Sequence, residues 1–140
     1  MAVADPIEAP DLAAIRLRLR RRAQRKVTRA ERIQTLRLCK LSNEQIRLEM
    51  GLSVDQFRRA AAWLDDAAAE SRMSPAGVLP IHAALEEYAA RHVRGVVRVG
   101  LLRQSGCDRL AIQERLGITR SQYENALMWW RDAMVDSGGM

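Results

Sequence analysis

The sequence predicts an all-α chain made of two tandem units, each with three or four helices. Hydrophobic residues make up 48% of the 140 residues, the share of a globular protein, whereas aromatic residues make up only 4%. Runs of β-branched and aromatic residues, which favour strands, are almost missing. The chain also aligns with itself when it is shifted by 66 residues, which indicates two copies of one unit.

The repeat is clearest between residues 51–67 and 117–133, which read GLSVDQFRRAAAWLDDA and GITRSQYENALMWWRDA. Identical residues pair as Gly51 and Gly117, Gln56 and Gln122, Ala60 and Ala126, Trp63 and Trp129, Asp66 and Asp132, and Ala67 and Ala133. The matched positions recur at helical spacing, so we interpret them as core positions present in both units. We expect a disordered tail at 1–10, a first unit at 11–70, a linker at 71–79, a second unit at 80–136 and a tail at 137–140.

The first unit is predicted to begin with an amphipathic helix whose polar face is rich in arginine. Asp11 is a suitable cap for this helix. Apolar residues then recur at every fourth position, at Ile15, Leu19, Ala23 and Val27. Residues 33–40 either continue this helix or form a second one after a break near Thr28.

Two short segments with strong helix signals follow. Ser42 and Gln45 form a capping box, in which the Ser hydroxyl accepts from the Gln45 amide and the Gln side chain accepts from the Ser42 amide. Gly51 suits the left-handed position after this helix. Ser53 and Gln56 form a second capping box. The helix that begins there carries an inward stripe of Phe57, Ala60, Ala61, Leu64 and Ala68.

The second unit repeats this order. We expect a long leading helix from about residue 80 to about residue 104, either continuous or interrupted at one of its glycines. Asp108 then caps a short helix, Gly117 ends it, and Thr119 and Gln122 form a third capping box. The last helix carries an inward stripe of Tyr123, Ala126, Leu127, Trp130 and Met134.

Positive charge is concentrated in one segment of the chain. Residues 16–40 hold eleven Lys and Arg residues against one acid, Glu31, a net charge of +10, whereas the whole chain carries +6. Residues 41–70 sum to −3, and residues 101–140 sum to zero. Because one carboxylate cannot neutralise eleven cations, we expect this segment to bind a polyanion such as nucleic acid.

A short helix, a three-residue turn with glycine and a second helix with a polar first turn make up the helix-turn-helix pattern. Residues 46–64 and 112–130 resemble the helix-turn-helix of region four of bacterial sigma factors and of LuxR-type regulators. They share an inward aliphatic residue, a Gly-Leu/Ile-Ser/Thr turn and an aliphatic or aromatic residue four positions past the cap. The resemblance implies DNA binding. It covers the last three helices of each unit and includes neither a polymerase-binding region nor a receiver domain.

In such units the second helix enters the major groove and presents its first turn to base edges. We therefore assign base contacts to the outward residues of the two helix starts: Asp55, Gln56, Arg58, Arg59, Arg120, Ser121, Gln122, Glu124 and Asn125. Arginine suits guanine, Asn and Gln suit adenine, and Glu suits cytosine. We assign phosphate contacts to the arginine-rich helix and to polar residues at helix starts: Arg16, Arg18, Arg20, Arg21, Arg22, Arg25, Lys26, Arg29, Asn43, Ser53 and Thr119.

The sequence lacks the residues that other classes of function need. No nucleophile–base set, phosphate loop or carboxylate pair indicates an enzyme, and we expect no cofactor. His82 and His92 lie ten residues apart, which is not a metal-ligand spacing. Cys39 and Cys107 are too few for a disulfide framework and are expected to be buried. The two repeated tryptophans are expected to pack the leading helix of each unit onto its last helix.

The expected function is sequence-specific binding of double-stranded DNA by a bacterial or phage transcription regulator. Two alternatives stay open: a nucleoid or small terminase-like packaging protein with little sequence preference, and an adaptor whose second unit binds a protein such as RNA polymerase. Homodimer formation is a further alternative, because the alanine-rich stretch 60–62 permits close packing within or between chains. No membrane span or secretion signal is predicted, so the expected compartment is the cytoplasm, in association with the nucleoid.

Overall fold

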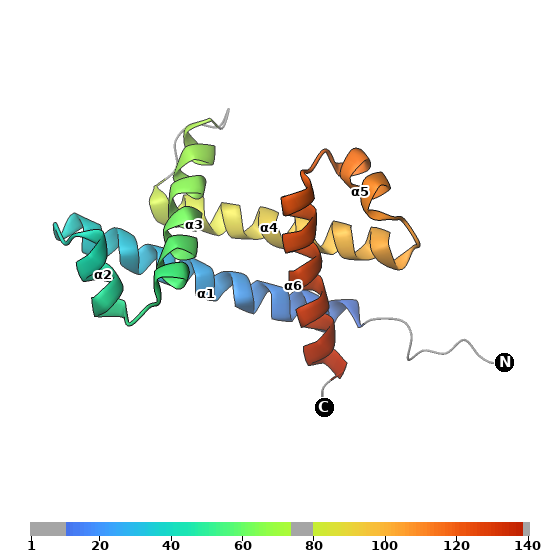
Figure 1. Cartoon of the computed structure of the whole chain (residues 1–140), viewed down its shortest axis with the longest axis horizontal. Coiled ribbons are helices and arrows are strands. Elements are labelled where there is room, and N and C mark those ends of the chain that lie inside the picture. The colour runs from blue at the N-terminus through green and yellow to red at the C-terminus, as the bar shows by residue number, and fades with distance from the viewer. Residues whose placement is uncertain (1–10, 74–79, 139–140) are drawn as a thin grey trace. The chain divides into compact units, whose positions relative to one another are not determined.

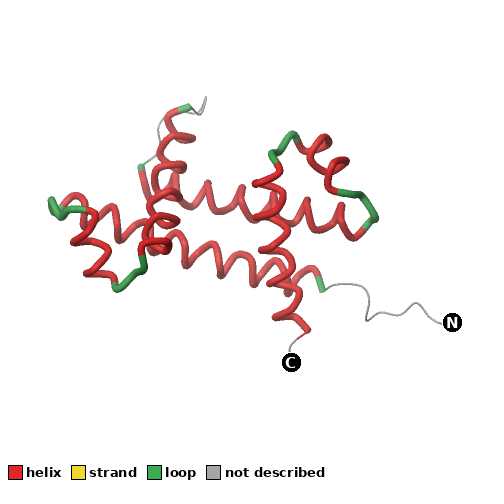
Figure 2. The backbone as a smooth tube through the Cα atoms, viewed as in Figure 1, coloured by secondary structure: helices red, strands yellow, loops and turns green. Residues whose placement is uncertain are grey.

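The structure is a computed structural model that describes residues 11–73 and 80–138, and the side chains up to residue 135. The helices in these ranges are α1 (Leu12–Leu38), α2 (Asn43–Met50), α3 (Val54–Arg72), α4 (Ile81–Gln104), α5 (Arg109–Leu116) and α6 (Arg120–Gly138) (Figure 1). All regular structure in the described ranges is helical (Figure 2), so the all-α prediction is confirmed. The tail predicted at 1–10, residues 74–79 of the predicted linker and residues 139–140 lie outside the described residues.

Helix α1 is continuous over 27 residues, so the alternative of a break near Thr28 is wrong. The Thr28 hydroxyl donates to the Gln24 carbonyl oxygen at 3.0 Å, inside the helix. The predicted cap is present, because the Ala14 amide donates to Asp11 Oδ1 at 3.1 Å. The apolar stripe is buried and extends beyond the predicted positions, through Ile15, Leu19, Ala23, Val27, Ala30 and Ile33. Burial of one uninterrupted stripe favours one helix over two.

The turn between α2 and α3 has the caps that the sequence predicts. The Gln45 amide donates to Ser42 Oγ at 3.1 Å, and the Ser42 amide donates to Gln45 Oε1 at 2.8 Å. Gly51 ends α2 in the left-handed region, with φ 65° and ψ 34°. Ser53 and Gln56 make the same two hydrogen bonds at the start of α3, at 3.1 and 2.9 Å.

The turn between α5 and α6 is built in the same way. Asp108 Oδ1 accepts from the Ala111 amide at 2.9 Å, and Gly117 ends α5 with φ 65° and ψ 39°. Thr119 and Gln122 form the predicted capping box at the start of α6, at 3.1 and 2.9 Å. The bounds of α5 and α6 are those of α2 and α3 shifted by 66 residues. Local signals therefore predicted both turns.

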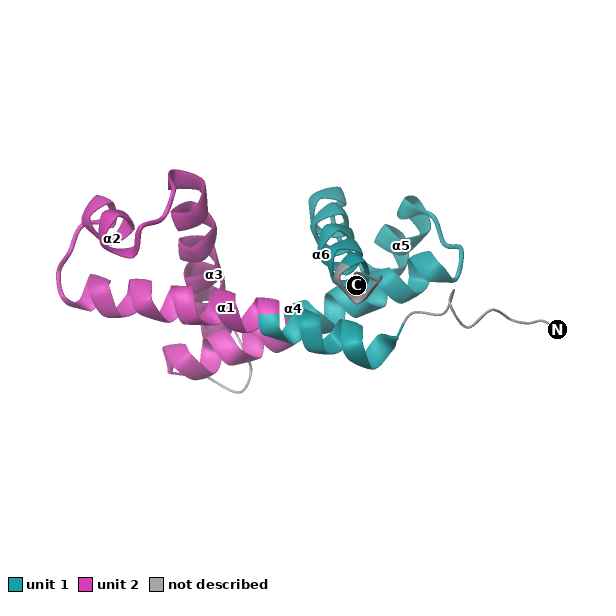
Figure 3. Ribbon diagram, turned by 90° about the horizontal axis from the view of Figure 1, so that it is seen from below, with its two compact units in different colours: residues 1–21, 92–140 teal, residues 22–91 magenta. Residues whose placement is uncertain are grey.

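The chain divides into two compact units that differ from the predicted ones. One unit comprises residues 22–91 and is called here the α2–α3 unit. The other comprises residues 1–21 and 92–140 and is called the α5–α6 unit (Figure 3). The division falls inside α1 and inside α4, whereas the sequence boundaries placed each long helix in a single unit. Both helices bury apolar residues along most of their length, at 15–33 and 84–100, so each contributes to two cores.

The ends of the long helices add three details. Helix α4 is continuous from Ile81 to Gln104, so neither internal glycine interrupts it. Helix α3 continues to Arg72, into the segment predicted as linker, because the alanines at 67–69 favour helix. Helix α1 ends at Leu38, and Lys40 follows in the left-handed region with φ 69°.

Both cysteines lie in turns rather than in the core. Cys39 is exposed and Cys107 is half-buried, so the prediction that both are buried is wrong. Cys39 follows the end of α1 and Cys107 follows the end of α4. Connecting segments run over the surface, where even an apolar side chain stays accessible to water.

Tryptophans of α6 form the core of the α5–α6 unit. Trp129 packs edge-on against His92 of α4, with ring centroids 4.4 Å apart, as predicted for this unit. Trp130 is 2% exposed and lies over Gly100 of α4. A Cβ atom at Gly100 would overlap the indole ring, so only glycine fits beneath Trp130.

The tryptophan of the α2–α3 unit contacts α4. Trp63 is buried, but its ring contacts Tyr88 of α4, with centroids 5.0 Å apart and planes at 80°. The sequence predicts packing of Trp63 on the leading helix, α1, and did not predict this contact with α4. The Tyr88 hydroxyl donates to Asp66 Oδ2 at 3.4 Å. Burial, followed by the charges of Asp66 and Glu70, raises the pKa of Tyr88 to about 12.

An ion pair joins α1 to α4 within this unit. His82 Nδ1 contacts Glu31 Oε2, and Glu86 Oε2 lies 3.9 Å from His82 Nε2. The hydrogen bond to Glu31 raises the pKa of His82 above its ordinary value, and the charge of Glu31 adds to this effect. The imidazolium therefore stabilises the contact between the two helices.

We expect this pair to make unfolding depend on pH. Because the folded-state pKa is raised, the stabilisation is complete below the unfolded pKa of about 6.5 and is lost as pH rises through the folded value. The wild type should therefore have a higher melting temperature than His82→Gln at about pH 5, and the two melting temperatures should converge at about pH 9. A difference of equal size at both pH values would contradict the ion pair.

Candidate nucleic-acid interface

The starts of α3 and α6 are open to solvent. Every residue assigned to base contacts is exposed: Asp55, Gln56, Arg58, Arg59, Arg120, Ser121, Gln122, Glu124 and Asn125. Exposure is required for groove contact. Local hydrogen bonds then determine which of these side chains have donors and acceptors available.

Two of the assigned arginines pair with carboxylates of their own helix. Arg58 Nη2 lies 2.7 Å from Asp55 Oδ1, and Arg120 Nε lies 3.1 Å from Glu124 Oε2. All four side chains are exposed, and pairs of this kind stabilise a helix by only about 0.3–0.5 kcal/mol. A bidentate contact with guanine is worth about 1–3 kcal/mol. Either arginine can therefore exchange its carboxylate for a base at low cost.

The assigned glutamines act as caps in the structure. The Gln56 and Gln122 carboxamide oxygens each accept from a backbone amide at 2.9 Å, which leaves their NH₂ groups for other partners. Ser53 and Thr119, assigned to phosphate, accept from backbone amides at 3.1 Å. Their hydroxyl hydrogens stay available as donors. Asn43 is exposed at the first position of α2.

Ser121 and Asn125 are the least engaged polar residues of the α6 start. Among the described residues, neither side chain has a hydrogen-bond partner. Asn125 therefore presents both the donor and the acceptor that match adenine. In α3 the least engaged assigned residue is Arg59, which has no carboxylate within ion-pair distance in the described ranges.

The polar face of α1 carries the arginine-rich segment. Four of its eight residues assigned to phosphate are exposed, namely Arg16, Arg20, Arg21 and Arg25. The other four are half-buried, namely Arg18, Arg22, Lys26 and Arg29. Arg18 Nη1 donates to the Ala133 carbonyl oxygen of α6 at 3.4 Å, within the α5–α6 unit. Part of its hydrogen-bonding capacity is therefore used in packing.

Four cations gather where α1 meets α3 in the α2–α3 unit. Burial lowers the pKa of Lys26 most, and the charges of Arg22, Arg29 and Arg59 lower it further. We call these four residues the α1–α3 cation cluster. Arg59, assigned to bases from the sequence, thus lies near cations assigned to phosphate. The four cations repel one another. A bound anion would be attracted by each of them and would reduce this repulsion.

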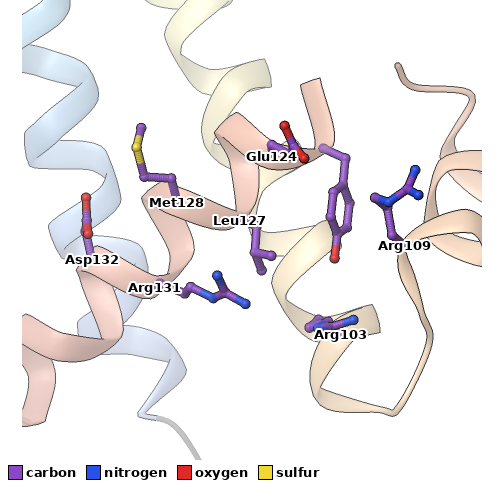
Figure 4. A pocket seen from close by; sticks show the side chains of 8 residues that line it. Arg103, Arg109, Glu124, Leu127, Met128, Arg131 and Asp132 are labelled. Atoms are coloured by element: carbon purple, nitrogen blue, oxygen red, sulfur yellow. The ribbon is translucent and has the colours of Figure 1, made fainter. Parts of the chain in front are cut away.

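A cleft on the α5–α6 unit contains arginines that the sequence analysis assigned to no site. Its volume is about 550 Å³, and Arg103, Arg109 and Arg131 line it from α4, α5 and α6 (Figure 4). Glu124, assigned to bases, also lines it. No spacing motif links three arginines on three helices, and the zero net charge of residues 101–140 gave no signal for them.

Three further findings concern membrane spans, metal sites and similarity to known proteins. Within the described ranges, no helix is long and apolar enough to cross a membrane. In the same residues, no group of three or more His, Cys, Asp or Glu side chains is arranged to hold a metal ion. No protein-family model, curated protein or solved structure matches the chain.

Proposed function

We propose that this protein binds double-stranded DNA through the starts of α3 and α6, as a nucleoid-associated transcription regulator of a bacterium or phage. One observation carries the proposal. In both α2–α3 and α5–α6, an eight-residue helix and a three-residue turn with left-handed glycine precede a 19-residue helix with an exposed, polar first turn. A helix that begins in this way fits the major groove, which is about 12 Å wide. We infer a binding function rather than an enzymatic one.

The local contacts support separate roles for the basic residues. Arg59 lies near Lys26 and has no carboxylate partner in the described ranges, so we assign it to phosphate rather than to a base. Arg58 and Arg120 pair only with exposed acids of their own helix, which a guanine can displace. Ser121 and Asn125 keep their full hydrogen-bonding capacity for contacts with bases.

Selection of bound fragments from random duplex DNA, followed by titration, tests the proposal. We expect the selected duplex to bind at least about 10³-fold more tightly than a scrambled duplex at the same salt concentration. Asn125→Ala or Arg120→Ala should each weaken binding to the selected duplex by about 1–3 kcal/mol and relax specificity at one base pair. Val135→Ala is the matched control, because Val135 is exposed on α6 far from its start, and it should leave affinity unchanged.

Two outcomes would support a different function, and a third would overturn the proposal. A ratio near one between selected and scrambled duplex supports a nucleoid or packaging protein that binds DNA without sequence preference. Unchanged DNA affinity in both α6 variants, together with lost co-purification of RNA polymerase, supports an adaptor role for the α5–α6 unit. Absence of duplex binding by the full chain would overturn the proposal.

A further inference from the structure

We infer that the cleft lined by α4, α5 and α6 binds a small organic anion with a flat ring and a phosphate group, of the size of a nucleoside monophosphate. All its lining residues belong to the α5–α6 unit, so the cleft is complete within one compact part of the chain. Its volume of about 550 Å³ falls inside the range of about 300–1,000 Å³ that is typical of small-molecule sites.

Three guanidinium groups give the cleft its affinity for an anion. Arg103, Arg109 and Arg131 reach the cleft from three different helices (Figure 4). Arg109 is half-buried, and its Nη1 donates to Gln113 Oε1 at 2.7 Å, which orients this guanidinium. Planar guanidinium groups donate two parallel hydrogen bonds to phosphate oxygens. Arginines from three elements around one cleft therefore favour a multiply charged oxyanion.

An apolar surface beside the arginines distinguishes the ligand from bare phosphate. Met128, 45% exposed, supplies the accessible apolar surface, and Tyr123 and Leu127, 3% and 7% exposed, form the floor beneath it. Phosphate alone, or a phosphate of a DNA backbone, gains nothing from such a surface. A flat ring does gain, because it buries the exposed apolar area of Met128.

The two acids of the cleft do not cancel its positive charge. Glu124 and Asp132 also line it, and Glu124 Oε2 lies 3.1 Å from Arg120 Nε of the same helix. Three arginines therefore face two carboxylates, which leaves a net positive charge in the lining. The electrostatic balance favours an anion over a cation or a neutral ligand.

Isothermal titration of the full chain with AMP, adenosine and inorganic phosphate, without DNA, tests this inference. We expect AMP to bind at least about tenfold more tightly than either adenosine or phosphate, because only AMP uses both parts of the cleft. Arg103→Gln and Arg131→Gln should each weaken AMP binding by about tenfold, the value of one hydrogen bond to a charged group, and leave adenosine binding unchanged. Met128→Ala should weaken AMP and adenosine binding but not phosphate binding.

Arg98→Gln is the matched control, since Arg98 is an exposed arginine of α4 that does not line the cleft. It removes the same charge and should leave AMP affinity unchanged. Thermal unfolding of each variant shows whether it has folded. AMP affinity equal to that of phosphate, AMP affinity insensitive to the Arg103 and Arg131 substitutions, or no AMP binding would each overturn the inference. Because no DNA is present, these outcomes are independent of the proposed DNA-binding function.

Discussion

Replacing Gly100 with alanine is expected to destabilise the protein by about 2–3 kcal/mol. The added methyl group would overlap the indole ring of Trp130, which is 2% exposed and cannot move away without disturbing the core of the α5–α6 unit. In a helix, alanine is more favourable than glycine by up to about 1 kcal/mol. The energetic cost of the overlap must exceed this gain for the substitution to destabilise the protein. A melting temperature lower by about 5–10 °C is the expected measurement.

Gly95→Ala provides the matched control in the same helix and the same unit. Apart from its chain neighbours and the backbone of its own helix, no described atom lies within 4 Å of a Cβ atom built at Gly95. The substitution should therefore stabilise the protein by about 0.5–1 kcal/mol, through helix propensity alone. Opposite signs for the two variants are the result that the packing predicts. An equal rise in melting temperature for both would show that Trp130 does not pack on Gly100.

The double variant Arg29→Gln/Arg59→Gln is expected to bind duplex DNA about 100-fold more weakly than the wild type. Each substitution removes a cation of the α1–α3 cation cluster, and a hydrogen bond to a charged group contributes about 1.5 kcal/mol or more. The loss should be similar for all duplex sequences, because phosphates carry no sequence information. Fluorescence anisotropy with a labelled duplex at fixed salt concentration measures this loss.

The control for this variant is Arg72→Gln/Arg98→Gln, which removes the same net charge. Both residues are exposed, and neither contributes to the cation cluster. We expect its affinity to fall by less than about threefold, the effect of net charge alone. Similar losses in the two double variants would mean that overall charge, rather than the cluster, attracts DNA.

The features that the sequence predicted are those determined by a few neighbouring residues. Ser42, Ser53 and Thr119 each sit three positions before a glutamine, and each forms its capping box. Gly51 and Gly117 adopt the expected left-handed conformation. The buried stripe of α1 followed from its four-residue spacing. All of these depend on contacts within about one helical turn.

The features that the sequence did not predict depend on residues far apart in the chain. The division of α1 and α4 between two units reflects which core each half enters, and no local signal encodes that. The proximity of Arg59 to Lys26, which changes its proposed role, needs two helices to be placed side by side. The arginines of the cleft come from three helices, so neither spacing nor local charge marked them. Cys39 was misjudged because apolar character alone predicts burial only inside an element.

The dependence of duplex affinity on salt concentration tests the DNA-binding proposal most directly. Each phosphate neutralised by the protein releases counterions and adds about −0.9 to the slope of log affinity against log salt concentration. About six phosphate contacts from the α1 face and the helix starts predict a slope of about −5 for the full chain. A slope near zero, or no duplex binding at low salt, would contradict the proposal that these cationic helix faces bind DNA.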